Sequence, residues 1–368
     1  MNLDMPAVDL CAEAVDVVAS DFVDDGDWTI RSEQDALPLL NARSLTGAVI
    51  FDGIDLSSLP EFPCLQTIEI LWIRGTALAD LSAFRNLREV TDNLMVFRNT
   101  QLASLEGFDN LERVRWMSVS QNEGLVSPRG MPKLRLVDSK MRISFGDTEG
   151  ATLDGFPPVG GSELDLTVTG RFTDLSPLSV TNAAGYSIGG SNIRSVEGIP
   201  VRKHYETLAL TGGTYTDLIP LRGIEEIDEL RITATHLRSL AGLETLRSLG
   251  DDVNDGSTLF ENEDLEDISA LSGVQSLGGS FELRNNPSLV SLEGLENIET
   301  MDRLSVRVCA SLTTLGPVLG GKLRSVESLR VTFNEQVPQC EADLLCQQLP
   351  GASCDVTGNA DLSSALCR

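Results

Sequence analysis

No stretch of this chain approaches the roughly 18 consecutive apolar residues that a helix needs to cross a bilayer. The opening segment, MNLDMPAVDLCAEAVDVV, has neither a basic start nor an apolar run long enough for an export signal. We therefore expect no transmembrane segment. Two possibilities stay open: an intracellular protein, or one exported through a signal that has been removed, with a lipid anchor as a further option.

Basic and aromatic residues are also scarce. The chain has 28 Lys and Arg against 55 Asp and Glu, which gives a formal net charge of −27. A field of this sign repels phosphate, which argues against general binding of nucleic acid or of an anionic membrane. Aromatic residues make up 5% of the chain, and we therefore expect a core of Leu, Ile and Val layers.

Catalytic motifs are missing as well. Only two histidines occur, His204 and His236, and neither lies in a recognised motif with Cys or Ser. The patterns GxxxxGK[ST], GxSxG and HExxH do not occur. Adjacent carboxylates such as Asp251 and Asp252 are expected in a chain this acidic and do not by themselves indicate an acid and base pair. The sequence predicts no enzyme and no cofactor.

Calcium is the one ion for which candidate ligands exist. Residues 24–27 (DDGD) and 251–256 (DDVNDG) gather carboxylate and amide oxygens. Neither segment follows the alternating spacing of an EF-hand loop, and solvated turns are the favoured interpretation of both.

What the chain does contain is a repeat, seen most clearly in residues 281–306, FELRNNPSLVSLEGLENIETMDRLSV. Its first apolar residues are two apart, as in a strand, and the next ones are three apart, as in a tight coil. A spacing of three also fits a helix, but the segments are short and carry an internal Gly or Pro. Short 3₁₀ turns or extended coil are the better interpretation.

The same unit recurs thirteen times, at intervals of 22–25 residues with one interval of 28. We expect a repeat solenoid with a single parallel sheet, about 13 coils of 22–25 residues and few short helices. The inward strand pairs would be Val49/Phe51, Leu71/Ile73, Leu94/Val96, Met117/Val119, Met141/Ile143, Leu164/Leu166, Tyr186/Ile188, Leu208/Leu210, Leu230/Ile232, Thr258/Phe260, Phe281/Leu283, Leu304/Val306 and Leu329/Val331.

Both ends of the chain depart from this repeat. A solenoid needs segments that cover its first and last apolar layers, so we assign residues 1–47 to an N-terminal cap, 48–334 to the solenoid and 335–368 to a C-terminal cap. Within the first cap, residues 28–30 predict a strand and the DALPLLNAR segment a short helix. Residues 249–257 predict a protruding loop, and residues 141–228 the least regular coils.

The seven cysteines gather at the two ends. Four lie in the last segment and two near the start, as expected for caps held by disulfides in an oxidising, extracytoplasmic compartment. A zinc site or free thiols are the alternative, although the tail lacks both CxxC spacing and histidine. The six end cysteines are Cys11, Cys64, Cys340, Cys346, Cys354 and Cys367, and Cys309 stands alone.

The unit resembles bacterial leucine-rich repeats, LxVxxNxxLxSLxGLxxLxxV, and is most similar to receptor L domains and to the 22-residue repeats of internalins. The resemblance covers residues 49–334 and implies a solenoid without specifying a function. It also implies a buried Asn or Cys after each strand, bonded to the neighbouring turn. The residues at that position are Asn99, Asn122, Asn286, Cys309 and Asn334, which would make Cys309 a free, buried thiol.

The tail resembles the cysteine-bearing C-terminal caps of secreted bacterial proteins of this kind. This resemblance favours the pairs Cys340–Cys367 and Cys346–Cys354, with Cys11–Cys64 at the other end. Four cysteines permit three connectivities, so the other pairings remain open.

The outward face of the sheet is the natural binding surface of a solenoid. In the expected register it carries six Arg and four acidic residues, and is mildly basic on an acidic protein. Two patches stand out as candidate partner-binding sites. The first comprises Trp72, Arg74, Met95 and Phe97, beside Ile50, and the second is a column of Arg284, Arg307 and Arg330.

For both patches a structural interpretation is open: the cap would cover Trp72 and Phe97, and Glu282 would balance the arginines. We interpret the chain as a non-enzymatic recognition protein of the cell surface or periplasm that binds a protein or glycan through the sheet face. The alternative is a structural or adhesive component of the envelope, which has no selective ligand and tolerates substitutions on that face.

Overall fold

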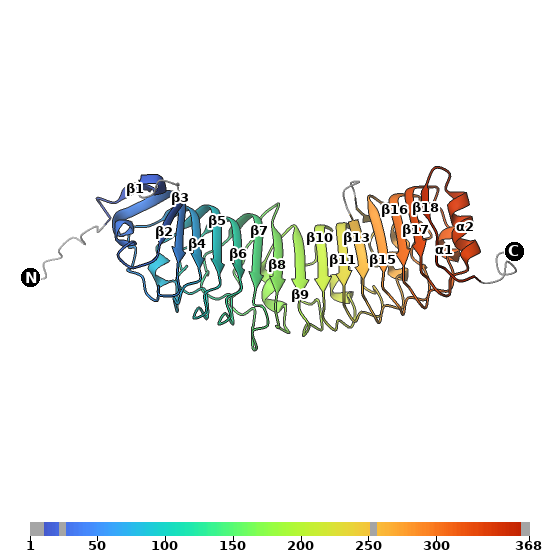
Figure 1. The fold of residues 1–368 in the computed structure, drawn as a ribbon, viewed down its shortest axis with the longest axis horizontal. Coiled ribbons are helices and arrows are strands. Elements are labelled where there is room, and N and C mark those ends of the chain that lie inside the picture. The colour runs from blue at the N-terminus through green and yellow to red at the C-terminus, as the bar shows by residue number, and fades with distance from the viewer. Residues whose placement is uncertain (1–10, 22–26, 251–255, 362–368) are drawn as a thin grey trace, which may run out of the picture. The chain divides into compact units, whose positions relative to one another are not determined.

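The computed structural model describes residues 11–21, 27–250 and 256–361. In this part of the chain all paired strands run parallel and are assigned to one sheet, and helices are few and short (Figure 1). The predicted repeat solenoid is therefore confirmed. The helical turns are η1 (Ala19–Asp21), η2 (Leu37–Asn41), η3 (Ser82–Phe84), η4 (Ser176–Val180), η5 (Ile219–Leu221), η6 (Ser269–Gly273), α1 (Gly316–Leu319) and α2 (Gln339–Gln348).

The chain forms two compact units, one holding the strands up to β8 and the other the strands from β9 onward. Those of unit 1 are β1 (Val15–Val18), β2 (Asp27–Ile30), β3 (Ala42–Asp52), β4 (Thr67–Arg74), β5 (Glu89–Phe97), β6 (Arg113–Ser120), β7 (Leu136–Ser144) and β8 (Asp165–Thr169). Those of unit 2 are β9 (Gly185–Gly189), β10 (His204–Thr211), β11 (Glu226–Thr233), β12 (Ser248–Leu249), β13 (Gly256–Phe260), β14 (Ser276–Leu277), β15 (Ser280–Arg284), β16 (Thr300–Arg307), β17 (Ser325–Thr332) and β18 (Ser353–Asp355).

Each coil places the same positions of its strand in the core. Leu71 of β4 lies opposite Leu94 of β5, and Ile73 lies opposite Val96, with all four side chains fully buried. Alternate residues of a strand point to opposite faces, so the residues between them point outward. The apolar pattern of the sequence thus determines which side chains form the sheet's outer surface.

Two strand pairs are corrected by the structure. In β8 the inward pair is Leu166/Val168, because Met141 lies opposite Leu166 and not Leu164. In β13 the inward residues are Ser257 and Leu259, whereas Thr258 and Phe260 point outward. Ser257 is tolerated inside because its hydroxyl accepts a hydrogen bond from the backbone N–H of Leu230 at 3.1 Å.

After several strands the chain turns through a residue with positive φ, such as Arg98 or Gln121, and the next residue buries a polar side chain. In unit 1 Asn122 shows the pattern: its Oδ1 accepts from the Asn99 backbone N–H at 2.9 Å, and its Nδ2 donates to the Val96 carbonyl at 2.9 Å. Asn99 makes the same pair of bonds, to Thr76 and Ile73. The predicted asparagine ladder is present there.

Unit 2 carries a second ladder. Asn286, Cys309 and Asn334 occupy the expected positions, and the structure adds Asn262 and Asn359. Asn262 was missed because the register of β13 was misassigned by one residue. Cys309 is a free and fully buried thiol, and burial raises its pKa to about 11.

The first cap contains the expected strand: β2 pairs with β3, Trp28 opposite Val49 and Ile30 opposite Phe51. The predicted short helix is the 3₁₀ turn η2. A disulfide joins Cys11 to Cys64, matching the pair expected from the sequence.

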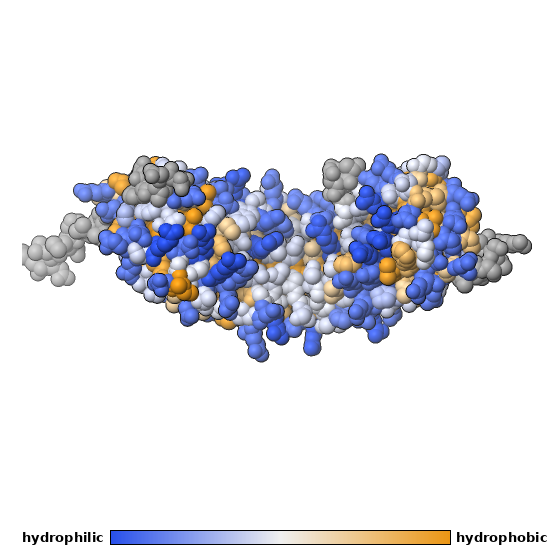
Figure 2. All heavy atoms as spheres, in the orientation of Figure 1, coloured by the Kyte–Doolittle hydropathy of each residue, from blue (hydrophilic) through white to orange (hydrophobic). Residues whose placement is uncertain are grey.

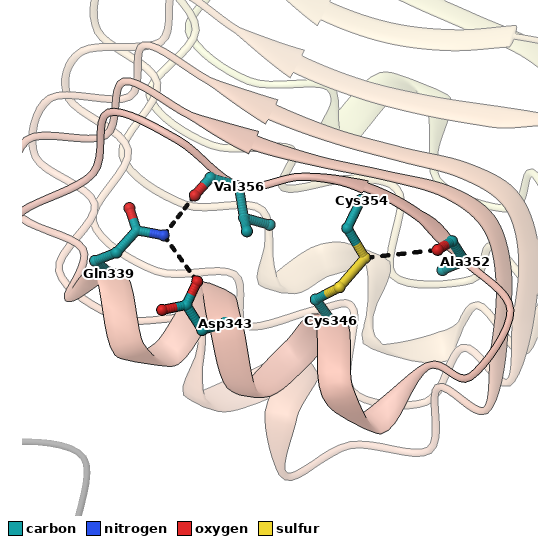
Figure 3. Close-up of a disulfide and its surroundings, with 6 residues drawn as sticks. All are labelled: Gln339, Asp343, Cys346, Ala352, Cys354 and Val356. Carbon is teal, nitrogen blue, oxygen red and sulfur yellow. Dashed lines mark hydrogen bonds between the residues drawn. A yellow bond between two sulfur atoms is a disulfide. The ribbon is translucent and has the colours of Figure 1, made fainter.

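At the other end β18 adds a last strand, with Cys354 opposite Leu329 and bonded to Cys346 of α2 (Figure 3). Gln339 of α2 donates from Nε2 to the Asp343 carboxylate at 3.0 Å and to the Val356 carbonyl, which fastens the helix to the segment after β18. This second disulfide also matches an expected pair.

The remaining expectations for the two ends stay predictions. Cys340 is disulfide-bonded, but its expected partner Cys367 lies outside the described residues. The cap boundaries at residues 47 and 335 are likewise untested. Most of the loop expected at 249–257 also lies outside the described residues.

Candidate functional site

The first predicted patch, defined by Trp72, Arg74, Met95 and Phe97, is assembled by the register of β4 and β5. Trp72 lies opposite Met95, and Arg74 lies opposite Phe97. All four side chains are half-buried, so they form part of the outer surface without projecting far from it. We call these four residues the aromatic patch.

Neighbouring residues define the edges of the aromatic patch. Ile50, expected beside it, is only 5% exposed and lies between Thr29 of β2 and Trp72 of β4. It therefore supports the patch from the side and offers little contact area. On the other side Met95 and Phe97 lie opposite the small residues Ser118 and Ser120 of β6.

Two polar features give the aromatic patch its chemistry. Arg74 forms an ion pair with Asp52 at 2.9 Å, and both side chains remain about one-third exposed. The indole Nε1 of Trp72 is buried and has no hydrogen-bond acceptor among the described residues.

The second predicted patch does not form one column. Arg284 lies opposite Arg307, but Arg330 lies opposite Ser305, two positions earlier along the strands. The prediction was wrong because Arg330 occupies the first outward position of β17, while the other two arginines occupy the second outward position of theirs. Arg284 covers the ring of Phe260 at 5.2 Å, and Arg330 contacts Asp355 at 3.2 Å.

A groove at the edge of the sheet was missed by sequence reasoning. It encloses about 610 Å³ in unit 2, beyond the strand ends, and includes positive-φ residues such as Glu261 and Val308. The sequence does indicate where this groove lies. Residues that directly precede a buried ladder position, such as Glu261 and Val308, line the groove. Its lining residues are Ala234, Thr235, His236, Glu261, Glu263, Asn285, Pro287, Val308 and Ala310.

Both histidines of the chain are paired with aspartates at the surface. His204 bonds Asp228 at 2.8 Å and His236 bonds Asp264 at 2.7 Å, each pair joining consecutive coils. Within the described residues no group of three or more His, Cys, Asp or Glu side chains could hold a metal ion. Most of the two segments considered for calcium, 24–27 and 251–256, lies outside those residues, so calcium binding is untested.

Hydrophilic residues dominate the face seen in Figure 2, and apolar residues appear as separate small patches between them. Among the described helices, none has the length and apolar content to span a membrane.

Parallel coils, buried ladders and an outward sheet face with an aromatic patch define a leucine-rich-repeat-like solenoid. Residues 65–135 match the family model Receptor L domain. That segment contains β4, β5 and β6, and hence the whole aromatic patch. The match supports an L-domain-like fold and a ligand-binding, non-enzymatic, extracellular type of domain, in agreement with the two disulfides. No curated protein matches the chain.

Proposed function

We propose that this protein is a non-enzymatic recognition protein of the cell surface or periplasm, which binds a protein or glycan through the outward face of its sheet. The observation that carries the proposal is the aromatic patch inside the segment that matches the receptor L domain. Trp, Phe, Met and Arg are the residue types enriched where partners bury surface. A half-buried, closely packed group of this kind binds with little loss of side-chain entropy.

Export fits the same proposal. Disulfides persist in oxidising compartments, and bonds at both ends of the chain would protect the caps there. A signal or lipid anchor in a bacterial precursor would deliver the protein to that compartment. The structural or adhesive alternative differs in one respect: it requires no selective contact at the aromatic patch.

The aromatic patch is tested by the double variant W72A/F97A. The purified protein is first screened against arrays of glycans and of extracellular proteins, and every ligand found is measured again with the variant. We expect binding to weaken by about 2 kcal/mol or more, roughly 30-fold, because hot-spot aromatics carry energies of this size.

The matched control is I54A/V126A, which removes two exposed apolar side chains of the same unit from loops that follow strands. It should bind as the unaltered protein does. Equal affinity of W72A/F97A and this control, with both folded, would count against the aromatic patch and favour the structural alternative.

A further inference from the structure

A small pocket lies on the outward side of β16 and β17, in unit 2. It encloses about 190 Å³ and is lined by Arg303, Ser305, Ser328 and Arg330, which we call the Arg–Ser pocket. In the strand register Arg303 lies opposite Ser328, and Ser305 lies opposite Arg330. The four residues therefore form a square on the sheet, in which the two arginines lie diagonally across from each other and the two serines take the other diagonal.

The hydroxyl groups of the pocket are unused. Ser305 is only 5% exposed, yet its hydroxyl makes no hydrogen bond to any group of the described residues. The Ser328 hydroxyl is likewise without a partner there. Neither hydroxyl oxygen is among the fully buried polar atoms that lack a partner, so both remain open to water and to a ligand. The pocket therefore offers two donors to a ligand.

The positive charge of the pocket is also largely available. No carboxylate of the described residues lies within 4.0 Å of Arg303, so this guanidinium has no ion-pair partner in that part of the chain. Arg330 has one, Asp355, but both side chains are about half exposed, and pairs of this kind contribute little. Arg307 extends the positive surface from the next outward position of β16.

Besides Asp355, a second carboxylate lies beside the pocket. Glu282 of β15 lies opposite Ser305, on the side away from Arg330. It would weaken the binding of an anion without blocking the four donor side chains. This makes Glu282 a position where a substitution should strengthen binding.

We propose that the Arg–Ser pocket binds the oxyanion group of a ligand: a carboxylate, sulfate or phosphate. Guanidinium forks and hydroxyl groups are the donors that such groups accept, and charge-assisted bonds of this kind are the strong ones. The volume suits a single group with a few waters, since one water occupies about 30 Å³ in the liquid. The inference deepens the proposed function by giving the ligand of the sheet face a negative charge.

The test uses the full chain labelled with nitrogen-15 and follows the arginine side-chain signals by NMR. Sodium sulfate, sodium phosphate and sodium acetate are titrated at constant ionic strength against sodium chloride, which separates binding from screening. We expect saturable shifts of the Arg303 and Arg330 signals, assigned with R303K and R330K. The three salts distinguish a tetrahedral anion from a carboxylate as the preferred group.

The variants decide the outcome. R303A and R330A should each weaken binding at least about tenfold, since a hydrogen bond to a charged group is worth about 1.5–3 kcal/mol. E282Q should strengthen binding, and R238A, which removes an exposed arginine elsewhere in unit 2, should leave it unchanged.

Absence of saturable shifts, or equal affinity in R303A and R238A, would overturn the proposal. Either result could coexist with a loss of ligand binding in W72A/F97A, so the two proposals fail separately.

Discussion

G107A is expected to lower the free energy of unfolding by about 3–5 kcal/mol, from overpacking and from unfavourable backbone geometry together. Gly107 adopts φ +119°, a conformation that L side chains rarely take. A methyl group there would lie 2.0 Å from the carbonyl carbon of Leu81 on the preceding coil. The contact is with backbone, which cannot move aside as a flexible side chain can.

The close approach at Gly107 is one of the contacts that link consecutive coils. The Leu81 backbone N–H donates to the carbonyl of Glu106 at 2.8 Å, and this bond requires the coils to touch at the glycine. Gly130 and Gly242 repeat the arrangement against Leu105 and Leu218. These three glycines therefore allow consecutive coils to approach closely.

The matched control for this prediction is G146A. Gly146 also has positive φ, +57°, but a methyl group there would meet nothing within 4 Å. G146A should lower the free energy of unfolding by only about 1–2 kcal/mol, which is the conformational penalty of an L residue in the left-handed region. Urea unfolding followed by circular dichroism measures both variants, and similar losses for the two would contradict this role of Gly107.

N122A should have the second large effect, also about 3–5 kcal/mol. It removes the acceptor of the Asn99 backbone N–H and the donor to the Val96 carbonyl, and leaves both groups buried. Each buried polar group without a partner costs about 1–3 kcal/mol. The Asn99 side chain also donates to Asn122 Oδ1 at 3.1 Å, so the loss extends to the next rung of the ladder.

N110A supplies the comparison for N122A. The exposed Asn110 also donates to a backbone carbonyl, that of Arg85 at 2.7 Å, but water can replace this bond when the side chain is removed. We expect a loss below about 1 kcal/mol. Hydrogen exchange should show faster amide exchange at Asn99 in N122A, and unchanged exchange there would argue against the ladder.

The solenoid could be predicted from the sequence because its apolar spacing repeats in every coil. The predicted register was wrong where the apolar spacing fits more than one inward pair. Leu164, Leu166 and Val168 alternate so regularly that two inward pairs fit equally well. In β13 the large residue Phe260 lies outside, under Arg284, while a hydrogen-bonded serine takes the inward place.

The candidate site was predictable to the same extent as the register. The sequence predicted correctly that Trp72 and Met95 are neighbours, because the register of β4 and β5 was assigned correctly. The prediction of a single arginine column was wrong, because the position of a residue within its strand, as well as the order of the strands, decides which side chains are neighbours. The edge groove was missed because its sequence signal, the residue before each ladder position, was not used. The Arg–Ser pocket could not be predicted, because the sequence does not reveal which hydroxyl groups lack a partner.

Hydroxyl-radical footprinting of the protein with a ligand from the screens tests the central claim most directly. Trp72, Met95 and Phe97 carry side chains that react readily with this reagent, and all three are half-buried on the outward face of unit 1. The account predicts that bound ligand lowers their oxidation, while exposed residues of the loops, such as Ile54 and Val126, oxidise as before. Protection of the loop residues with unchanged oxidation of these three would contradict it.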